Sequence, residues 1–173
     1  MRVIAGEHRS RKLKTLPGLN TRPTPDRLRE ALFNVLAPRI GGTVFLDLYA
    51  GTGAVGIEAL SRGALRAIFV ERSRAAVAVI RENLAALGLE TRAEVFTSKP
   101  QPVLDHVQAD IVFLDPPYDM ENEYEITMNL LTAVKAQLVI VQHASRLALK
   151  AEYGRLRRTR VLKQGDNSLS FYE

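Results

Sequence analysis

The sequence predicts an α/β fold with a mostly parallel central sheet, helices on both faces of the sheet and a C-terminal antiparallel hairpin. Short apolar runs alternate along the chain with segments whose apolar residues recur at helical spacing, the pattern of successive strand–helix units. Residues 111–114 are four consecutive apolar residues, as expected for a strand covered on both faces. Strands expected at 159–164 and 168–172 flank Gln164-Gly165-Asp166-Asn167, whose residues favour a hairpin turn.

The first twenty residues are expected to form a short basic hairpin or extended arm. They carry the apolar stretch Val3-Ile4-Ala5, a glycine-containing turn and the breaker pair Pro17-Gly18. Residues 21–173 are expected to form the α/β core. We expect a single domain, because 173 residues suit one hydrophobic core.

Strands and helices then alternate along the core. Thr24 is the expected N-cap and Pro25 the expected first residue of a helix that ends before Pro38. The expected strands are 44–48, 66–71, 92–96, 110–114 and 137–142. The expected helices between them are 54–62, 73–87 with Ser73 and Gly88 as caps, 101–107, and one that comes after an acidic loop at 119–125 and reaches about residue 135.

Composition excludes several classes of function. Cysteine is absent, which rules out disulfides, thiolate chemistry and Cys-ligated metal sites. The three histidines His8, His106 and His143 are widely spaced, so no metal site is expected. No apolar stretch approaches the roughly 20 residues that span a bilayer, and no secretion signal is recognisable. We therefore expect a cytoplasmic protein that makes no membrane contact.

Positive charge is concentrated towards both ends of the chain. Residues 1–40 hold nine Lys and Arg against three acids, and residues 146–163 hold seven against one, whereas the whole chain carries only +5. Two basic ends on a mildly acidic body favour a polyanionic partner. A solvated charged surface without a partner would give the same composition.

Asp115-Pro116-Pro117-Tyr118 comes directly after the strand 110–114. Proline cannot donate to a strand ladder, so the strand must end there. A carboxylate, a free carbonyl oxygen and an aromatic ring then lie at the carboxyl end of a central strand, where open α/β sheets bind ligands. Two acceptors beside a flat ring suit a planar heterocycle with an exocyclic amino group. The alternative is a proline-rich turn that contains an incidental Asp and Tyr.

A glycine-rich turn comes after the strand 44–48. Gly51 and Gly53 allow a tight turn and close approach to a ligand, and Gly56 allows close packing of helix on strand. By itself, such a turn serves a dinucleotide, S-adenosylmethionine or no ligand. The next strand ends in Glu71, about twenty residues on, where a carboxylate suits a ribose diol.

Together, Asp47 to Gly56, Glu71 and Asp115 to Tyr118 resemble the motifs of Rossmann-like S-adenosylmethionine-dependent methyltransferases that modify an exocyclic amine. Three further segments resemble the bacterial 16S ribosomal RNA guanine-N2 methyltransferases, and they extend the similarity through nearly the whole chain: Val3 to Leu13, Arg22 to Asn34 and Gly165 to Tyr172. The resemblance implies the Rossmann-like methyltransferase fold, with S-adenosylmethionine as cofactor.

The resemblance also implies a set of cofactor-binding residues. Those of the glycine turn lie near the methionine half of the cofactor: Asp47, Tyr49, Gly51, Thr52, Gly53 and Gly56. Glu71 binds the ribose, and Arg22 and Thr24 lie near the methionine carboxylate, although a phosphate contact is equally open for Arg22. Where relatives usually carry Asp or Asn for the adenine amino group, this chain has Lys99. A lysine cannot accept from that group, so Ser98 or a backbone carbonyl is expected to replace it.

The implied reaction is direct methyl transfer to a guanine amine in small-subunit ribosomal RNA. Asp115 and the Pro116 carbonyl accept the hydrogens of the amine, Pro117 completes the motif, and Tyr118 stacks on the base; whether Asp115 also removes the proton stays open. The base must be flipped or unpaired to reach such a pocket. Residues of the basic arm are expected to bind RNA, together with Arg22: Arg9, Arg11 and Lys12. Because the arm is distant in sequence from the glycine turn, we expect it to act on RNA alone.

Other functions are also compatible with these residues. A DNA adenine-N6 methyltransferase would use the same acceptor pair, although the terminal similarities and the lack of room for a DNA-recognition domain favour ribosomal RNA. A non-catalytic RNA-binding or ribosome-assembly factor could keep this fold; Lys99 slightly favours it and Asp115 opposes it. An NAD-dependent oxidoreductase is disfavoured, because the Asp-Pro-Pro-Tyr motif has no role in hydride transfer. The expected partner is ribosomal RNA or an assembling small subunit, bound by a monomer.

Overall fold

The structure is a computed structural model that describes residues 1–16, 25–117 and 119–173. Its strands are β1 (Val44–Leu48), β2 (Arg66–Glu71), β3 (Ala93–Thr97), β4 (Ile111–Leu114), β5 (Leu138–Ala144), β6 (Glu152–Tyr153), β7 (Leu156–Gln164) and β8 (Asn167–Tyr172). Its helices are α1 (Asp26–Leu36), α2 (Ala54–Ser61), α3 (Arg74–Leu87), α4 (Pro100–Leu104) and α5 (Glu121–Leu131), with a 3-10 turn, η1, at Glu90–Arg92.

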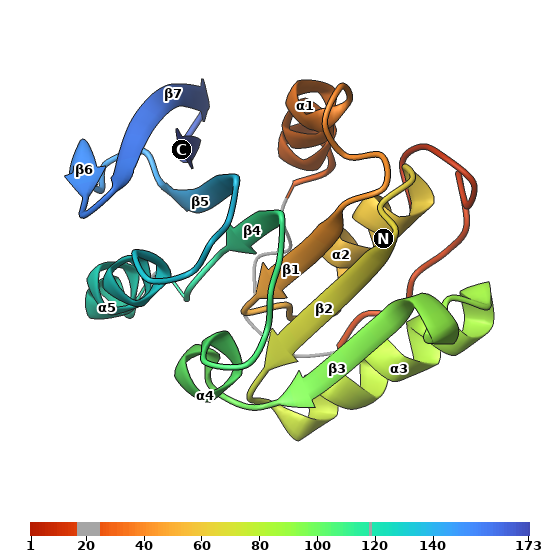
Figure 1. The fold of residues 1–173 in the computed structure, drawn as a ribbon. Coiled ribbons are helices and arrows are strands. Elements are labelled where there is room, and N and C mark those ends of the chain that lie inside the picture. Colours follow the sequence, from red (N-terminus) through yellow and green to blue (C-terminus); the bar gives the residue numbers. More distant parts are fainter. Residues whose placement is uncertain (17–24, 118) are drawn as a thin grey trace.

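The strands form one sheet in the order β3-β2-β1-β4-β5-β8-β7-β6 (Figure 1). The first five strands in this order pair in parallel, and β8 and β7 continue the sheet in antiparallel fashion. The predicted α/β class, with its C-terminal hairpin, is therefore confirmed. The caps predicted for α3 are also present, because the Ser73 hydroxyl accepts from the Ala76 N–H and Gly88 ends the helix in a left-handed conformation.

Several local features differ from the predictions. α5 begins at Glu121, inside the expected acidic loop, because acids are favourable in the first turn of a helix. Pro25 is the N-cap of α1 rather than its first helical residue, and Thr24 lies outside the described residues. A short antiparallel pair of β6 with the start of β7 extends the sheet. The sequence does not predict this pair, because two residues are too few to show an alternation.

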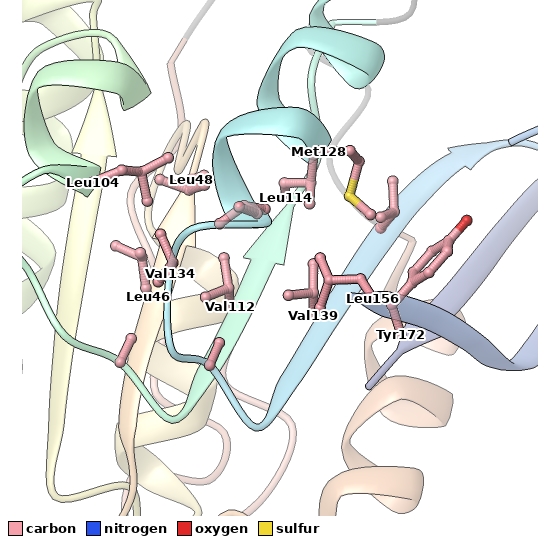
Figure 2. Close-up of a cluster of buried hydrophobic side chains, with 14 of the residues drawn as sticks. Leu46, Leu48, Leu104, Val112, Leu114, Met128, Val134, Val139, Leu156 and Tyr172 are labelled. Carbon is pink, nitrogen blue, oxygen red and sulfur yellow. The ribbon is translucent and has the colours of Figure 1, made fainter. Parts of the chain in front are cut away.

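Side chains of the sheet pack into clusters on its two faces. On one face, residues of β1 and β4 meet α4 and α5: Leu46, Leu48, Val112 and Leu114. Figure 2 shows this cluster, with Met128 of α5 beside Leu114. On the other face, Phe45 and Phe113 pack with α1 and α2. Burial on both faces explains the uninterrupted apolar runs of these strands.

The chain adds parallel strands on both sides of β1. It first runs outward to β2 and β3, and then returns so that β4 pairs on the other side of β1. Asp47 stands opposite Phe113 in this pairing. Such a reversal leaves a crevice beyond the carboxyl ends of the two central strands, the usual ligand site of open α/β sheets. The glycine turn and the Asp-Pro-Pro motif both begin there.

The arm forms the predicted hairpin over its described residues, 1–16. Arg2 and Lys12 form an antiparallel bridge, and Val3 and Leu13 are buried against α2 and α3. Gly6 has a φ of 83°, and a Cβ atom there would lie 1.9 Å from the Ser61 carbonyl oxygen. Only glycine therefore allows the turn of the arm to approach α2 so closely.

Candidate functional site

A cavity of about 840 Å³ opens at the carboxyl ends of the central strands. This volume suits a drug-sized or nucleoside-sized ligand. Residues singled out from the sequence line much of it: Asp47, Tyr49, Gly51, Thr52, Glu71, Ser98, Asp115, Pro116 and Pro117. Gly53 and Gly56 lie behind this surface, Gly53 as the N-cap of α2 and Gly56 within that helix.

Asp47 holds α2 against the end of β1. Its carboxylate is buried and accepts the Gly56 N–H at 2.9 Å. Burial raises the pKa of Asp47 to about 7, repulsion from Glu71 adds to the rise, and the Gly56 hydrogen bond opposes it. A Cβ atom at Gly56 would lie 2.3 Å from the ring of Phe69, so this position is closed to larger residues.

Glu71 joins the glycine turn to the start of α3. One carboxylate oxygen accepts the Gly51 N–H at 2.9 Å and the other accepts the Ser73 N–H at 2.8 Å. The side chain also lines the cavity. Each carboxylate oxygen has a second lone pair, so Glu71 can hold this turn and still accept from a ligand hydroxyl.

Tyr49 begins the turn in a left-handed conformation, with a φ of 63°. Its hydroxyl donates to the Glu123 carboxylate at 2.8 Å and lies 2.7 Å from the Thr127 hydroxyl. Burial raises the pKa of this phenol, so it remains a donor. A left-handed tyrosine is strained, and such strain persists where the surroundings hold the residue in place; here α5 does so.

Asp115 and Pro116 place two acceptors at the end of β4. The Asp115 carboxylate lines the cavity. Desolvation raises its pKa well above the ordinary range, and repulsion from Asp47 adds to the rise. The Pro116 carbonyl oxygen accepts from the hydroxyl of buried Tyr124 at 3.2 Å. Tyr118 lies outside the described residues.

The segment after β3 lines the same cavity through Ser98, Lys99 and Pro100. The Ser98 N–H donates to the Glu71 carbonyl oxygen at 3.1 Å, and its hydroxyl donates to the Lys99 carbonyl oxygen at 2.9 Å. Lys99 is the N-cap residue of α4 and makes no side-chain capping bond. The lysine thus lies at the cavity where the resemblance leads one to expect an acidic or amide side chain.

The arm contributes to the cavity wall, which the sequence did not reveal. Met1, Thr15 and Leu16 line it beside Gly51 and Thr52. The arm therefore lies beside the glycine turn, although its distance from the turn in sequence led us to expect that it acts on RNA alone. Distance in sequence was a poor guide, because the hairpin folds back over α2 and α3. Leu16, an apolar residue close to the basic residues of the arm, was a signal of this contact in the sequence.

The basic residues divide into two groups. Arg9 and Lys12 have exposed side chains, whereas Arg11 donates to the Ala86 carbonyl oxygen at the end of α3. Much of the 146–163 cluster is engaged within the protein. The engaged side chains are Lys150 with Glu125, Arg155 with the Thr132 and Val134 carbonyls, Arg157 with Glu152, and Arg158 with the Leu149 carbonyl. Arg22 lies outside the described residues.

A second cavity, of about 340 Å³, separates the arm from α1. Three arginines line it, namely Arg2, Arg9 and Arg27, together with two acids, Asp26 and Glu30. Asp26 pairs with the buried Arg29 at 3.0 Å. The three arginines therefore line a groove in which one of the two acids, Asp26, is already paired with Arg29.

Among the described residues, no group of three or more His, Cys, Asp or Glu side chains gathers in a way that could hold a metal ion. No helix in the described ranges is sufficiently long and apolar to cross a bilayer.

The sheet order places the glycine turn and the Asp-Pro-Pro motif together beyond β1 and β4, where the strand order reverses. These features define a protein with the Rossmann-like methyltransferase fold. The chain belongs to the family described as Conserved hypothetical protein 95, whose model matches residues 1–173.

Relatives of known name cover much or all of the chain. "Putative rRNA methyltransferase YlbH" of Bacillus subtilis (strain 168) is 34% identical over 183 residues, which cover 100% of this chain and 98% of that protein. "Ribosomal RNA small subunit methyltransferase D" of Escherichia coli (strain K12) is 43% identical over 133 residues, covering 76% of this chain and 66% of that protein. The solved structure of "Putative methyltransferase yhhF from Escherichia coli" is 37% identical, with a TM-score of 0.87 and coverage of 99% of this chain and 96% of that one.

Proposed function

We propose that this protein is an S-adenosylmethionine-dependent methyltransferase that methylates N2 of a guanine in 16S ribosomal RNA. The observation that carries the proposal is the acceptor pair of Asp115 and Pro116 in the same cavity as Glu71 and the glycine turn. The names of the Bacillus subtilis and Escherichia coli relatives support ribosomal RNA as the substrate. We further propose that the chain acts as a cytoplasmic, single-domain monomer on ribosomal RNA or an assembling small subunit.

The residues of the cavity fit this cofactor. Asp47, Glu71 and Asp115 bring three carboxyl groups to one cavity, and their mutual repulsion helps to raise the pKa of Asp47 and Asp115. A positively charged ligand would relieve that repulsion. When bound, S-adenosylmethionine supplies a methyl group already activated by its sulfonium. Glu71 would accept from the ribose hydroxyls, and Asp47 would face the methionine half beside Tyr49, Gly51 and Thr52.

Asp115 and Pro116 would act on the substrate amine. Its lone pair is delocalised into the base, so it is a poor nucleophile. Acceptance of its two hydrogens by the carboxylate and the carbonyl favours a pyramidal nitrogen with a directed lone pair. The interaction strengthens as positive charge develops on nitrogen, which is the condition for catalysis. In this proposal Tyr118 stacks on the base, and Pro117 completes the motif.

The adenine end of the cofactor would meet the segment after β3. The Ser98 hydroxyl already donates to the Lys99 carbonyl oxygen, so its oxygen keeps lone pairs that could accept from an adenine amino group. Arg22 and Thr24 remain proposed contacts of the methionine carboxylate, with an RNA phosphate as the alternative for Arg22.

RNA would bind across the arm. Arg9 shares its groove with Arg2 and Arg27, and Lys12 is exposed on the same hairpin. These four cations are better placed for phosphates than Arg11, whose guanidinium is partly engaged by Ala86. Phosphate contacts of this kind supply affinity and position rather than base selectivity.

The variant Asp115→Ala tests the proposal. Incubation with 16S ribosomal RNA, small subunits and DNA, each with labelled S-adenosylmethionine, should show wild-type transfer to RNA guanine and a loss of more than tenfold, about 1.4 kcal/mol, in the variant. Asp105→Ala is the matched control, because Asp105 is exposed at the end of α4. Transfer to DNA adenine would support the DNA alternative. RNA binding without transfer by the wild type would support the assembly factor.

A further inference from the structure

The side-chain amide of Asn83 in α3 joins the basic arm to the glycine turn. Its oxygen accepts the Lys14 N–H at 2.7 Å, and its nitrogen donates to the Lys14 carbonyl oxygen at 3.1 Å. The same nitrogen donates to the Thr52 carbonyl oxygen at 3.2 Å. Both hydrogens of the amide nitrogen are thus engaged, one on the arm and one on the turn.

The burial of Asn83 makes the loss of any of these hydrogen bonds costly. Its side chain is only 3% exposed, so water cannot readily replace a lost partner. A buried polar group left unsatisfied is costly, and the arm and the turn can move apart only if the amide loses partners on one side. The positions of Lys14 and Thr52 are therefore linked through one rigid planar group.

The tip of the arm is fastened separately. Glu58, buried in α2, accepts the N–H groups of Ile4 and Ala5 at 2.8 and 3.0 Å. The Ser61 hydroxyl donates to the Ala5 carbonyl oxygen at 2.6 Å and accepts the His8 N–H at 3.0 Å. Glu58 and Ser61 therefore fasten the tip to α2. Asn83 differs from them because it bonds both the arm and the glycine turn.

The residues just after Lys14 are part of the cavity. Thr15 and Leu16 line the same wall as Gly51 and Thr52. Movement of the arm at Lys14 would therefore alter the cavity in two ways, through its own residues and through the turn that Asn83 holds.

We propose that Asn83 is a positioning residue that couples the docking of the arm to the binding of cofactor at the glycine turn. The inference rests on the proposed function for the identity of the ligand. A ligand that orders the turn then also orders the arm, and coupling of this kind is reciprocal. The arm that offers cations to RNA and the turn that holds the methyl donor would accordingly be ordered together.

Hydrogen exchange of residues 1–16, measured with and without S-adenosylhomocysteine, tests this coupling. In the wild type, ligand should slow exchange in the arm, including the Lys14 amide. In Asn83→Ala that ligand-dependent protection should vanish, and the ligand should bind about five- to tenfold more weakly, as expected when the turn loses the buried hydrogen bond that holds it at Thr52. Asn83→Asp should behave in the same way, because it keeps the acceptor for Lys14 and loses both donors.

Ser61→Ala is the matched control, because it loosens the arm at its tip and leaves the bond to Thr52 intact. It should speed exchange in the arm and yet retain ligand-dependent protection and wild-type affinity. Equal losses of affinity in Ser61→Ala and Asn83→Ala would overturn the coupling and leave the proposed function standing. Ligand-dependent protection retained in both Asn83 variants would do the same. A wild-type protein that binds no S-adenosylhomocysteine would overturn the proposed function, and this inference with it.

Discussion

The hydroxyl of Tyr124 donates to the main-chain carbonyl oxygen of Pro116 over 3.2 Å. The neighbouring residues of α5, Glu123 and Thr127, hold the hydroxyl of Tyr49. The first two turns of α5 therefore hold the chain at two points, just beyond the end of β4 and just beyond the end of β1. A helix whose start looks from the sequence like an acidic loop thus sets the spacing between the proposed amine site and the glycine turn.

Tyr124→Phe should lower kcat about five- to tenfold, which corresponds to roughly 1 kcal/mol for one hydrogen bond. Without the hydroxyl, the Pro116 carbonyl is no longer held in place for the substrate amine. Cofactor affinity should stay at the wild-type value, because Tyr124 is absent from the cavity lining that carries Glu71. Steady-state kinetics and titration with S-adenosylhomocysteine measure the two effects separately.

Tyr153→Phe is the control for that variant. Tyr153 is buried in the same apolar cluster as Tyr124, and its hydroxyl accepts the Lys150 N–H at 3.2 Å, away from the cavity. Its loss should lower the melting temperature without changing kcat. An equal fall of kcat in both variants would mean that Tyr124 acts through general stability.

The rate of methyl transfer should rise with pH as Asp115 ionises. Burial and the nearby Asp47 raise its pKa well above the ordinary range, so the carboxyl stays neutral to a higher pH than an exposed aspartate. A neutral carboxyl is a weaker acceptor than a carboxylate. We therefore expect kcat/KM to increase through a midpoint well above about pH 4, the ordinary value. A profile that is flat from about pH 5 to 9, with the fold intact by circular dichroism, would contradict an ionised acceptor.

Glu71→Ala should raise the KM for cofactor and leave kcat nearly unchanged at saturation. A carboxylate that holds a ribose diol supports the ground state and the transition state alike. The variant should also lose stability, because the N–H groups of Gly51 and Ser73 lose their acceptor. Glu94→Ala is the control, since Glu94 pairs with Arg66 on the surface. Unchanged cofactor affinity in Glu71→Ala would remove this residue from the site.

Gly56→Ala should destabilise the protein by about 1–3 kcal/mol, the usual cost of overpacking a core. The new methyl group would lie 2.3 Å from the fully buried ring of Phe69, and the shift of α2 would disturb the Gly56 bond to Asp47. Gly41→Ala should change stability by less than about 0.5 kcal/mol, because no atom of the described residues lies within 4 Å of its added Cβ atom. Thermal denaturation of both variants decides whether the close approach at Gly56 is as tight as the structure indicates.

Features that depend on neighbouring residues in the sequence were predictable. Pro116 and Pro117 end β4, Gly51 and Gly53 lie in the turn after β1, and Glu71 ends β2, because each effect arises from local chemistry. The meeting of Gly51, Glu71, Pro116 and Pro117 in one cavity was predictable from the parallel order of the strands.

Features that depend on tertiary contact were not predictable. Asn83 resembles any polar residue of a helix, and only the folded arm shows that it bonds Lys14 and Thr52. Arg11 resembles a phosphate ligand until the end of α3 is placed beside it. Side chains that act between elements distant in sequence leave no periodic or local signal.

The pairing of β1 with β4 also bears on the kinetics of folding. β1, β2 and β3 succeed one another along the chain, so the ribose side of the cavity joins strands that are close in sequence. β4 is far from β1 in sequence, because β2, α3 and β3 lie between them. The hydrogen bond between the Val44 N–H and the Asp110 carboxylate spans 66 positions. Because distant contacts close more slowly than near ones, we expect the ribose side to assemble first during synthesis. The ability to hold a base amine would then be acquired later, when the translating ribosome has released β4 for docking.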